Sequence, residues 1–183
     1  MIRTLALLSL AIAVGVAAPA YAQHPDLSGT WVLQRDSTVG RTTATTGDAA
    51  FAKGDMGVGW GSPQGSPLTI VQTPARLTVT FDAFTAYDLQ PKVHFAYALD
   101  GAESRNAVVM GSAPPSRSTA AWQDAALVIT TTYTAPAGVS AAAEAFDVRQ
   151  TLAVDATGRL SIQSRRLGAN GTANIVTATY TRR

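Results

Sequence analysis

The chain has 183 residues and carries 14 Lys and Arg against 12 Asp and Glu, with two His and no Cys. Hydrophobic residues make up 46% of the chain and charged residues only 14%, which excludes a charged disordered tail. The lack of Cys excludes a disulfide scaffold and a thiolate metal site. A formal net charge of +2 does not predict the clustered basic face that nucleic acid requires. The length suits one domain.

Residues 1–22 have the three parts of a secretory signal peptide. A positive charge near the start precedes a long apolar run, and Ala20 and Ala22 then place small residues at the positions that a signal peptidase recognises. We therefore expect cleavage before Gln23 and a single mature domain that spans residues 23–183.

The signal peptide predicts an exported protein, either periplasmic or secreted. The apolar run is too short to span about 30 Å of hydrocarbon comfortably, and no second apolar stretch of the chain is long enough to do so. Lipidation at the cleavage site needs a Cys, which the chain lacks. We expect a soluble mature protein that is not a lipoprotein and has no transmembrane segment.

Apolar residues in the mature chain alternate with a period of two. Along residues 77–81 and 93–99 every second residue is apolar, which puts one face of a strand on a core and the other in water. Thr is abundant between them, and its branched Cβ suits a pleated surface. In chain order, the predicted strands lie near residues 28–34, 67–73, 76–82, 92–99, 104–111, 117–123, 126–134, 145–154, 158–165 and 173–181.

Short turn signals separate these strands. Asp100-Gly101 favours positive φ and a tight hairpin, and Thr73-Pro74 and Pro114-Pro115 interrupt other runs. Strands this closely spaced pair as antiparallel neighbours, because parallel neighbours need long crossovers. We therefore predict an all-β fold, an antiparallel up-and-down meander of about 8–10 strands that closes into a β-barrel and so loses its exposed edges.

Two segments depart from this spacing. Residues 35–66 contain no convincing strand and are rich in Thr, Gly and Asp, with Trp60 among glycines. They form either a flexible flap over a cavity mouth, with Trp60 as its apolar contact, or a disordered surface loop. The Ala-rich residues 140–145 are too few for a secure helix, so we expect a helical turn or the start of a strand.

The mature domain opens with the motif Gly29-x-Trp31 at the start of the first predicted strand. This motif resembles the lipocalin signature. With later elements in the same order, the chain resembles a broad group of exported bacterial lipocalin-like proteins of mostly unassigned function. These elements are Leu99-Asp100-Gly101-x-Glu103 with Asn106, Trp122-x-Asp124-x-x-Leu127-Val128-Ile129, Arg149-Gln150-Thr151-Leu152, Asp155-x-x-Gly158-x-Leu160 and Tyr180-x-Arg182.

The resemblance implies a lipocalin-like barrel whose closed end is plugged by the Trp31 indole. An arginine of the last strand packs over that indole in lipocalins, and Arg182 is the matching residue here. This role is structural, so Trp31 is not a candidate for ligand binding. The chain departs from the pattern in the long segment 35–66 and at Ala125, where such proteins have Gly. The departure at Ala125 leaves the type of that hairpin turn open.

Residues able to carry chemistry are few. His24 adjoins the predicted mature N-terminus, and His94 alternates with Phe95 on its strand and so should face outward. No His or Cys motif has metal-ligand spacing, so we expect no metal, no cofactor and no catalytic residue. Asp100 and Glu103 flank a turn, which we expect Asp100 to shape. The alternative, a carboxylate pair that meets only in the fold, stays open.

Arginine occurs as two adjacent pairs, Arg165-Arg166 and Arg182-Arg183. We expect them to be solvated strand ends. The alternative is that they bind an anionic head group or a membrane surface.

Inward-facing aromatic and polar side chains are the remaining candidates. In a small barrel such side chains either fill the interior or line a cavity for one small ligand. Apolar walls with a few polar groups are typical of a ligand pocket. The predicted ligand-binding residues are Phe81, Phe95, Tyr97, Trp122, Tyr133, Phe146 and Gln150.

These features predict an exported β-barrel that binds or carries a small hydrophobic or amphipathic molecule without catalysis. One alternative is an enzyme, a hydrolase or lyase that uses the same cavity, with His94 or Tyr97 as its first candidate residues. Another is a packed barrel that acts through protein contacts in the cell envelope. The barrel fold does not choose among them.

Overall fold

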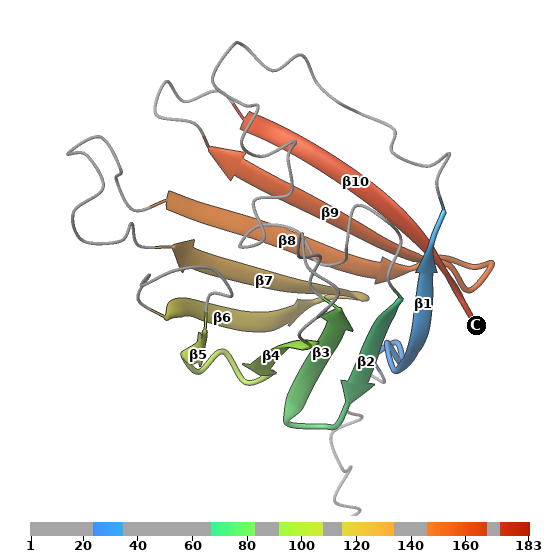
Figure 1. Cartoon of the computed structure of the whole chain (residues 1–183), viewed down its shortest axis with the longest axis horizontal. Helices are drawn as coiled ribbons and strands as arrows, with labels where there is room; N and C mark the ends of the chain where they lie inside the picture. The colour runs from blue at the N-terminus through green and yellow to red at the C-terminus, as the bar shows by residue number, and fades with distance from the viewer. Residues whose placement is uncertain (1–23, 35–66, 83–91, 108–114, 134–145, 168–172) are drawn as a thin grey trace, which may run out of the picture.

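The structure, a computed structural model, describes residues 24–34, 67–82, 92–107, 115–133, 146–167 and 173–183. Within these ranges all regular secondary structure is β-strand, in one sheet of 10 strands in the order β4-β3-β2-β1-β10-β9-β8-β7-β6-β5 (Figure 1). The strands are β1 (Gly29–Leu33), β2 (Leu68–Gln72), β3 (Arg76–Asp82), β4 (Lys92–Ala98), β5 (Ser104–Asn106), β6 (Ser116–Gln123), β7 (Ala126–Tyr133), β8 (Phe146–Val154), β9 (Leu160–Leu167) and β10 (Ala173–Arg182).

The sheet is the predicted antiparallel meander. Chain neighbours pair from β1 to β4 and from β5 to β10, and β1 also pairs with β10, so that Trp31 lies opposite Arg182. This rolls the sheet into a nearly closed barrel and confirms the predicted fold class. The strand boundaries agree closely with the prediction except at β5, which ends at Asn106; the last predicted residues of that strand, 108–111, lie outside the described residues.

Several sequence predictions fall outside the described residues. They concern the signal peptide at 1–22, the segment 35–66 and the short Ala-rich stretch 140–145. Among the residues that the structure does describe, no helix has the length and hydropathy to cross a membrane.

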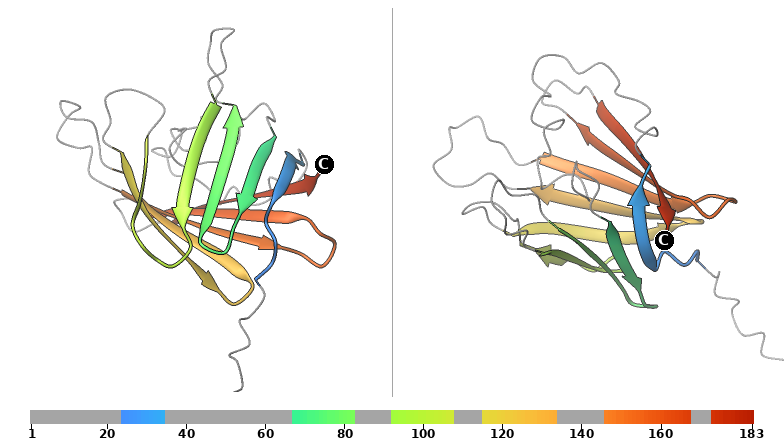
Figure 2. Two further views of the ribbon diagram at one scale, coloured as in Figure 1. Left: turned by 90° about the horizontal axis from the view of Figure 1, so that it is seen from below. Right: turned by 45° about the vertical axis from the view of Figure 1, so that its right-hand side comes forward.

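The two ends of the barrel differ in their connections (Figure 2). We call one end the turn end, because four short described turns join the strands there. We call the other the loop end, because each strand end there adjoins a segment outside the described residues. The described turns comprise residues 73–75, 99–103, 124–125 and 155–159.

Local hydrogen bonds explain the turn sequences. The Asp155 carboxylate accepts the Thr157 hydroxyl at 2.6 Å and the Arg159 amide at 3.0 Å, which holds its pKa well below the usual range. Asp100 accepts the Ala102 amide at 3.0 Å, which confirms that it shapes its turn.

The turn at Asp124 and Ala125 settles a point that the sequence left open. Asp124 has φ 54°, and it is the only non-glycine residue of the described chain with positive φ. A type I′ turn needs positive φ at both central residues. Ala125 therefore fits because this hairpin, which pairs Gln123 with Ala126, does not use that turn.

Trp31 plugs the turn end, as the resemblance implied. Its side chain is fully buried, and its indole N–H donates to the Leu27 carbonyl at 2.9 Å. The Arg182 guanidinium lies over the ring at 4.8 Å, and it donates to the Asp26 carbonyl at 2.9 Å. Gly29 has φ +143°, and a Cβ there would meet Arg182 at 3.3 Å. The Gly-x-Trp spacing thus lets one arginine cover both residues.

Tyr180 packs beside this plug, opposite Leu33 and Leu160. It is 3% exposed, and burial raises its pKa from 10.0 to about 12. Because the folded pKa exceeds the unfolded one, its stabilising contribution is complete below about pH 10 and is lost as the pH rises through 12.

We expect the free energy of unfolding to fall by about 2 kcal/mol from this group across that range. Urea titrations at about pH 9 and about pH 11.5 measure the fall. The Tyr180→Phe variant should show a smaller fall, since other tyrosines and lysines titrate equally in both proteins. An equal fall in the two proteins would contradict the assignment.

Side chains, not a backbone ladder, close the barrel between β4 and β5. The Asn106 amide accepts the Ala96 N–H at 2.7 Å and donates to the Ala96 carbonyl at 3.2 Å. Ser104 accepts the Ala98 N–H at 2.8 Å. One asparagine thus supplies both hydrogen bonds that a paired residue of a neighbouring strand would make.

Candidate functional site

The inward faces of the barrel differ in polarity. On β2 to β4 they are apolar and aromatic, whereas the six buried polar side chains of the described residues all lie on β5 to β9. These polar residues are Asn106, Ser116, Ser118, Thr131, Gln150 and Ser164. The same strands also carry buried apolar side chains such as Ile129, Val148 and Leu152, so the six polar residues, which we call the polar face, lie among apolar ones.

Most of these polar groups are already paired within the protein. Asn106 closes the seam with β4, and the Ser116 hydroxyl donates to the Asn106 carbonyl at 3.3 Å. The hydroxyls of Ser118 and Thr131 lie 2.9 Å apart across β6 and β7. These four side chains therefore already have hydrogen-bond partners within the protein.

Ser164 and Gln150 remain, and Gln150 is the one with a buried polar atom that lacks a partner among the described residues. The Gln150 side chain is 2% exposed, and its Nε2 is a buried donor with no hydrogen-bond partner in the part of the chain that the structure describes. Its cross-strand neighbours are Ile129 on β7 and Ser164 on β9, so it has an apolar neighbour on one side and a polar one on the other. A buried unsatisfied donor destabilises a fold by about 1–3 kcal/mol. This free donor makes Gln150 a candidate for contact with a ligand.

Arg166 lies further toward the loop end. It pairs with Val148, which is buried, so both side chains face inward. Its guanidinium stacks over the Phe146 ring at 3.8 Å, and Phe146 stacks on Tyr133 with ring centroids 5.2 Å apart. The three ion pairs between described residues do not include Arg166. The stack therefore presents a positive charge at the mouth of the barrel.

A second aromatic group follows β3 and β4. The rings of Phe81 and Phe95 lie 5.9 Å apart, and those of Phe95 and Tyr97 lie 6.4 Å apart. All three are buried and belong to the hydrophobic core. They form a continuous apolar wall.

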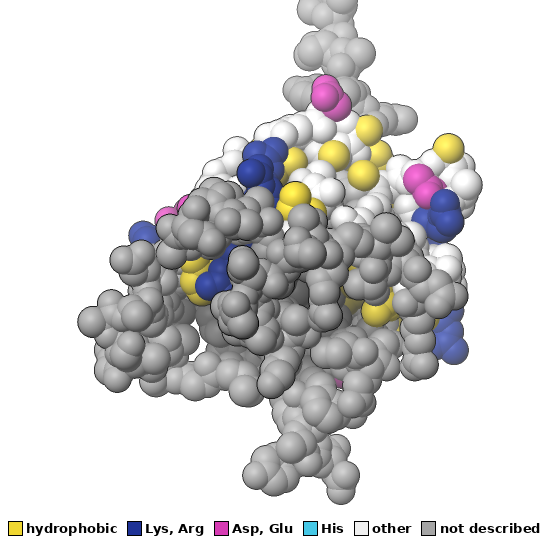
Figure 3. All heavy atoms as spheres, turned by 90° about the horizontal axis from the view of Figure 1, so that it is seen from above, with side chains coloured by type: hydrophobic (Ala, Val, Ile, Leu, Met, Phe, Trp, Pro, Cys, Tyr) yellow, Lys and Arg dark blue, Asp and Glu magenta, His cyan; other side chains and the backbone are white. Residues whose placement is uncertain are grey.

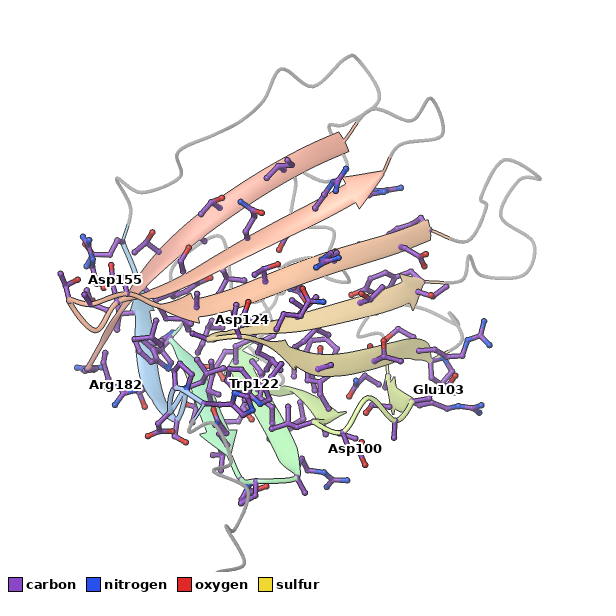
Figure 4. All side chains as sticks on the ribbon, turned by 180° about the vertical axis from the view of Figure 1, so that it is seen from behind. Asp100, Glu103, Trp122, Asp124, Asp155 and Arg182 are labelled. Atoms are coloured by element: carbon purple, nitrogen blue, oxygen red, sulfur yellow. The ribbon has the colours of Figure 1, made fainter. Side chains whose placement is uncertain are left out.

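The structure thus divides the seven predicted ligand-binding residues into separate groups. Phe81, Phe95 and Tyr97 form the apolar wall, Tyr133 and Phe146 form the mouth with Arg166, and Gln150 lies on the polar face. Trp122 is apart from them at the turn end (Figure 4), where its indole stacks on His24 with centroids 4.4 Å apart.

Ser164 is not among the predicted ligand-binding residues, and Arg166 is predicted as a solvated strand end, with binding of an anionic head group as the alternative. The alternation of side chains along β9 indicates instead that both residues face inward. Leu160 and Ile162 are inward residues of β9, and the same alternation places Ser164 and Arg166 on that face. Arg165 lies on the outer face opposite Arg149, and it is exposed as expected.

His94 is exposed on the outer face, as predicted, and its Nδ1 lies 3.0 Å from the Thr80 hydroxyl. None of the described Asp, Glu or His residues is buried, and no three of them group as metal ligands. Figure 3 shows one side of the molecule, where the visible Lys and Arg side chains are scattered instead of forming a patch. The described interior therefore offers hydrogen bonds and one charge, but no carboxylate or imidazole.

No protein-family model and no curated protein matches the chain. Solved structures do match it. An asparagine-to-alanine mutant of the fluorescent protein UnaG aligns with a TM-score of 0.50 and 16% identity, covering 86% of this chain and 96% of that chain. Wild-type UnaG aligns with a TM-score of 0.48 and 15% identity, covering 86% and 97%. At this identity the likeness concerns the fold alone.

Proposed function

We propose that this protein is exported after loss of residues 1–22 and binds a small hydrophobic or amphipathic molecule in its barrel without catalysis. The observation that carries the proposal is the buried, unpartnered Nε2 of Gln150 on the polar inner face. A ligand acceptor at this nitrogen removes its desolvation penalty. The signal-peptide pattern at the N-terminus supports export, and the exported compartment is the periplasm or the medium.

The ligand site lies in the loop-end half of the interior. At the turn end the interior is closed to solvent, since the side chains of Trp31, Leu77, Leu127, Leu152 and Leu160 are all 0% exposed. On β7 to β9 side chains become more accessible toward the loop end, where Phe146, Tyr133 and Arg166 are only partly buried. Phe81 and Val93, at the loop end of β3 and β4, stay buried. A ligand there has aromatic walls and polar partners within reach.

The first test is native mass spectrometry of the protein purified from a periplasmic extract of its own host. Extra mass that is lost on denaturation, with a lipophile recovered by solvent extraction, is the expected result. A bare protein mass, with no thermal stabilisation by a panel of lipids and aromatic compounds, would instead support a filled barrel.

The second test is a substitution inside the polar face. Ser164→Leu puts four apolar carbons beside Gln150, and we expect the co-purified molecule to be lost while the fold persists. Gln163→Leu, on the exposed outer face of the same strand, is the matched control and should keep the molecule. Circular dichroism checks the fold of both variants. Retention of the molecule by folded Ser164→Leu would contradict the site.

A further inference from the structure

Two arginines of the described residues share the parity of inward residues on their strands, one at each end; Arg182 is exposed at the turn end, whereas Arg166 is partly buried at the loop end. Arg182 is part of the plug at the turn end, where its guanidinium covers Trp31 and donates to the Asp26 carbonyl. The Arg166 guanidinium stacks on Phe146 and forms no ion pair with a described residue. The loop-end interior formed by described residues therefore carries one positive charge that no described carboxylate neutralises.

We propose that the ligand is a monoanionic amphiphile whose negative group is bound by Arg166 and whose chain carries a hydrogen-bond acceptor bound by Gln150. This inference rests on the proposed function and specifies its ligand class, an organic carboxylate or sulfate. The recognised chemistry is one negative charge at the mouth and one acceptor oxygen further inside.

The positions of the two side chains support this order. Gln150 pairs with Ser164 and Val148 pairs with Arg166, so Gln150 and Arg166 are diagonal neighbours with Cα atoms about 7–8 Å apart. Arg166 leans over Phe146, which is the loop-end residue of β8. Its guanidinium therefore lies closer to the loop end than the Gln150 amide. The aromatic wall on β3 and β4 remains for the apolar body of the ligand.

The charge count favours a monoanion. A single guanidinium neutralises a carboxylate or sulfate ester, whereas a phosphate dianion would leave one negative charge without a partner in a partly buried position. Because the ring of Phe146 covers one face of the guanidinium, the N–H edge stays available. That edge matches the two oxygens of a carboxylate.

Two fluorescent dyes that differ only in charge test the inference. Anilinonaphthalene sulfonate is a monoanion, and N-phenylnaphthylamine is the same aromatic body without the sulfonate. Their affinities are measured by titration for the purified protein, for Arg166→Met and for Arg165→Met. Methionine keeps an apolar stem against Phe146, and Arg165→Met removes an equal charge from the outer face of the same strand.

We expect the protein to bind the sulfonate more tightly than the neutral dye. Arg166→Met should weaken the sulfonate roughly 10-fold or more and change the neutral dye by less than about twofold. Arg165→Met should change neither dye by more than about twofold. Equal weakening of the sulfonate by both variants, or equal binding of the two dyes by the unmodified protein, would overturn the inference and leave the proposed function standing. Binding of neither dye would count against the proposed function itself.

Displacement of the dyes distinguishes the anion types. Decanoate and decyl sulfate should displace the sulfonate better than decanol does, and decyl phosphate in its dianionic form should be the weaker anion. If the dianion is the best competitor, the charge assignment at Arg166 is wrong.

A separate variant tests whether Gln150 contacts the ligand. Gln150→Leu removes the unpartnered donor, so the ligand-free protein should become more stable while affinity for the extracted molecule falls. Gln163→Leu is again the outer-face control and should change neither property appreciably. A Gln150→Leu variant with undiminished affinity would show that the donor does not contact the ligand.

Discussion

Replacing Trp31 with alanine should lower the free energy of unfolding by about 3–5 kcal/mol, the largest effect we expect from any single substitution. Trp31 is 0% exposed, contacts the core at the turn end and satisfies the Leu27 carbonyl. Its removal leaves a cavity and strips Arg182 of the ring beneath it. Thermal unfolding followed by circular dichroism should show a decrease of roughly 6–20 °C in Tm.

Two milder variants keep this prediction testable if the alanine variant fails to fold. Trp31→Phe retains an aromatic ring but loses the bond to the Leu27 carbonyl, and it should lower the free energy of unfolding by about 1–2 kcal/mol. Arg182→Met keeps the apolar stem over Gly29 but loses the cation and its hydrogen bond. If neither variant lowers Tm, the plug does not stabilise the barrel.

The plug also shows why the fold could be predicted so fully. Gly29 and Trp31 are a short motif with a steric reason, since Arg182 lies over both. The strands could be predicted because a barrel with a solvent-exposed outer face and a buried inner face imposes a period of two on the side chains of every strand. Turns such as Asp155–Gly158 were readable because their side chains bond to their own backbone.

The site was less predictable, because it depends on which strand ends meet. The aromatic candidates all look alike in sequence, yet Trp122 lies at the turn end and Phe146 at the loop end. Arg166 follows Arg165 directly, and deciding which of the two faces inward requires the alternation to hold along all of β9, as the register with Val148 confirms. The Gln150 Nε2 lacks a partner because none of the described side chains on the neighbouring strands accepts its hydrogen bond, and no local sequence pattern shows this.

The seam between β4 and β5 is another feature that sequence patterns do not reveal, and it leads to the second large effect. Replacing Asn106 with alanine removes both hydrogen bonds to the Ala96 backbone. The N–H and carbonyl of Ala96 then lose their partners in a partly buried position, which should lower the free energy of unfolding by about 2–5 kcal/mol. Urea denaturation measures this loss.

Hydrogen exchange separates opening of the seam from loss of global stability. In the Asn106→Ala variant the Ala96 amide should exchange faster than the amides of β8 and β9, which keep their backbone ladders. Ser104→Ala is the matched control, because it removes the single bond to the Ala98 amide and leaves Asn106 in place. It should expose Ala98 and leave Ala96 protected. If Ala96 stays protected without Asn106, then backbone pairing between β4 and β5 replaces the asparagine. The barrel would in that case be closed without its side chain.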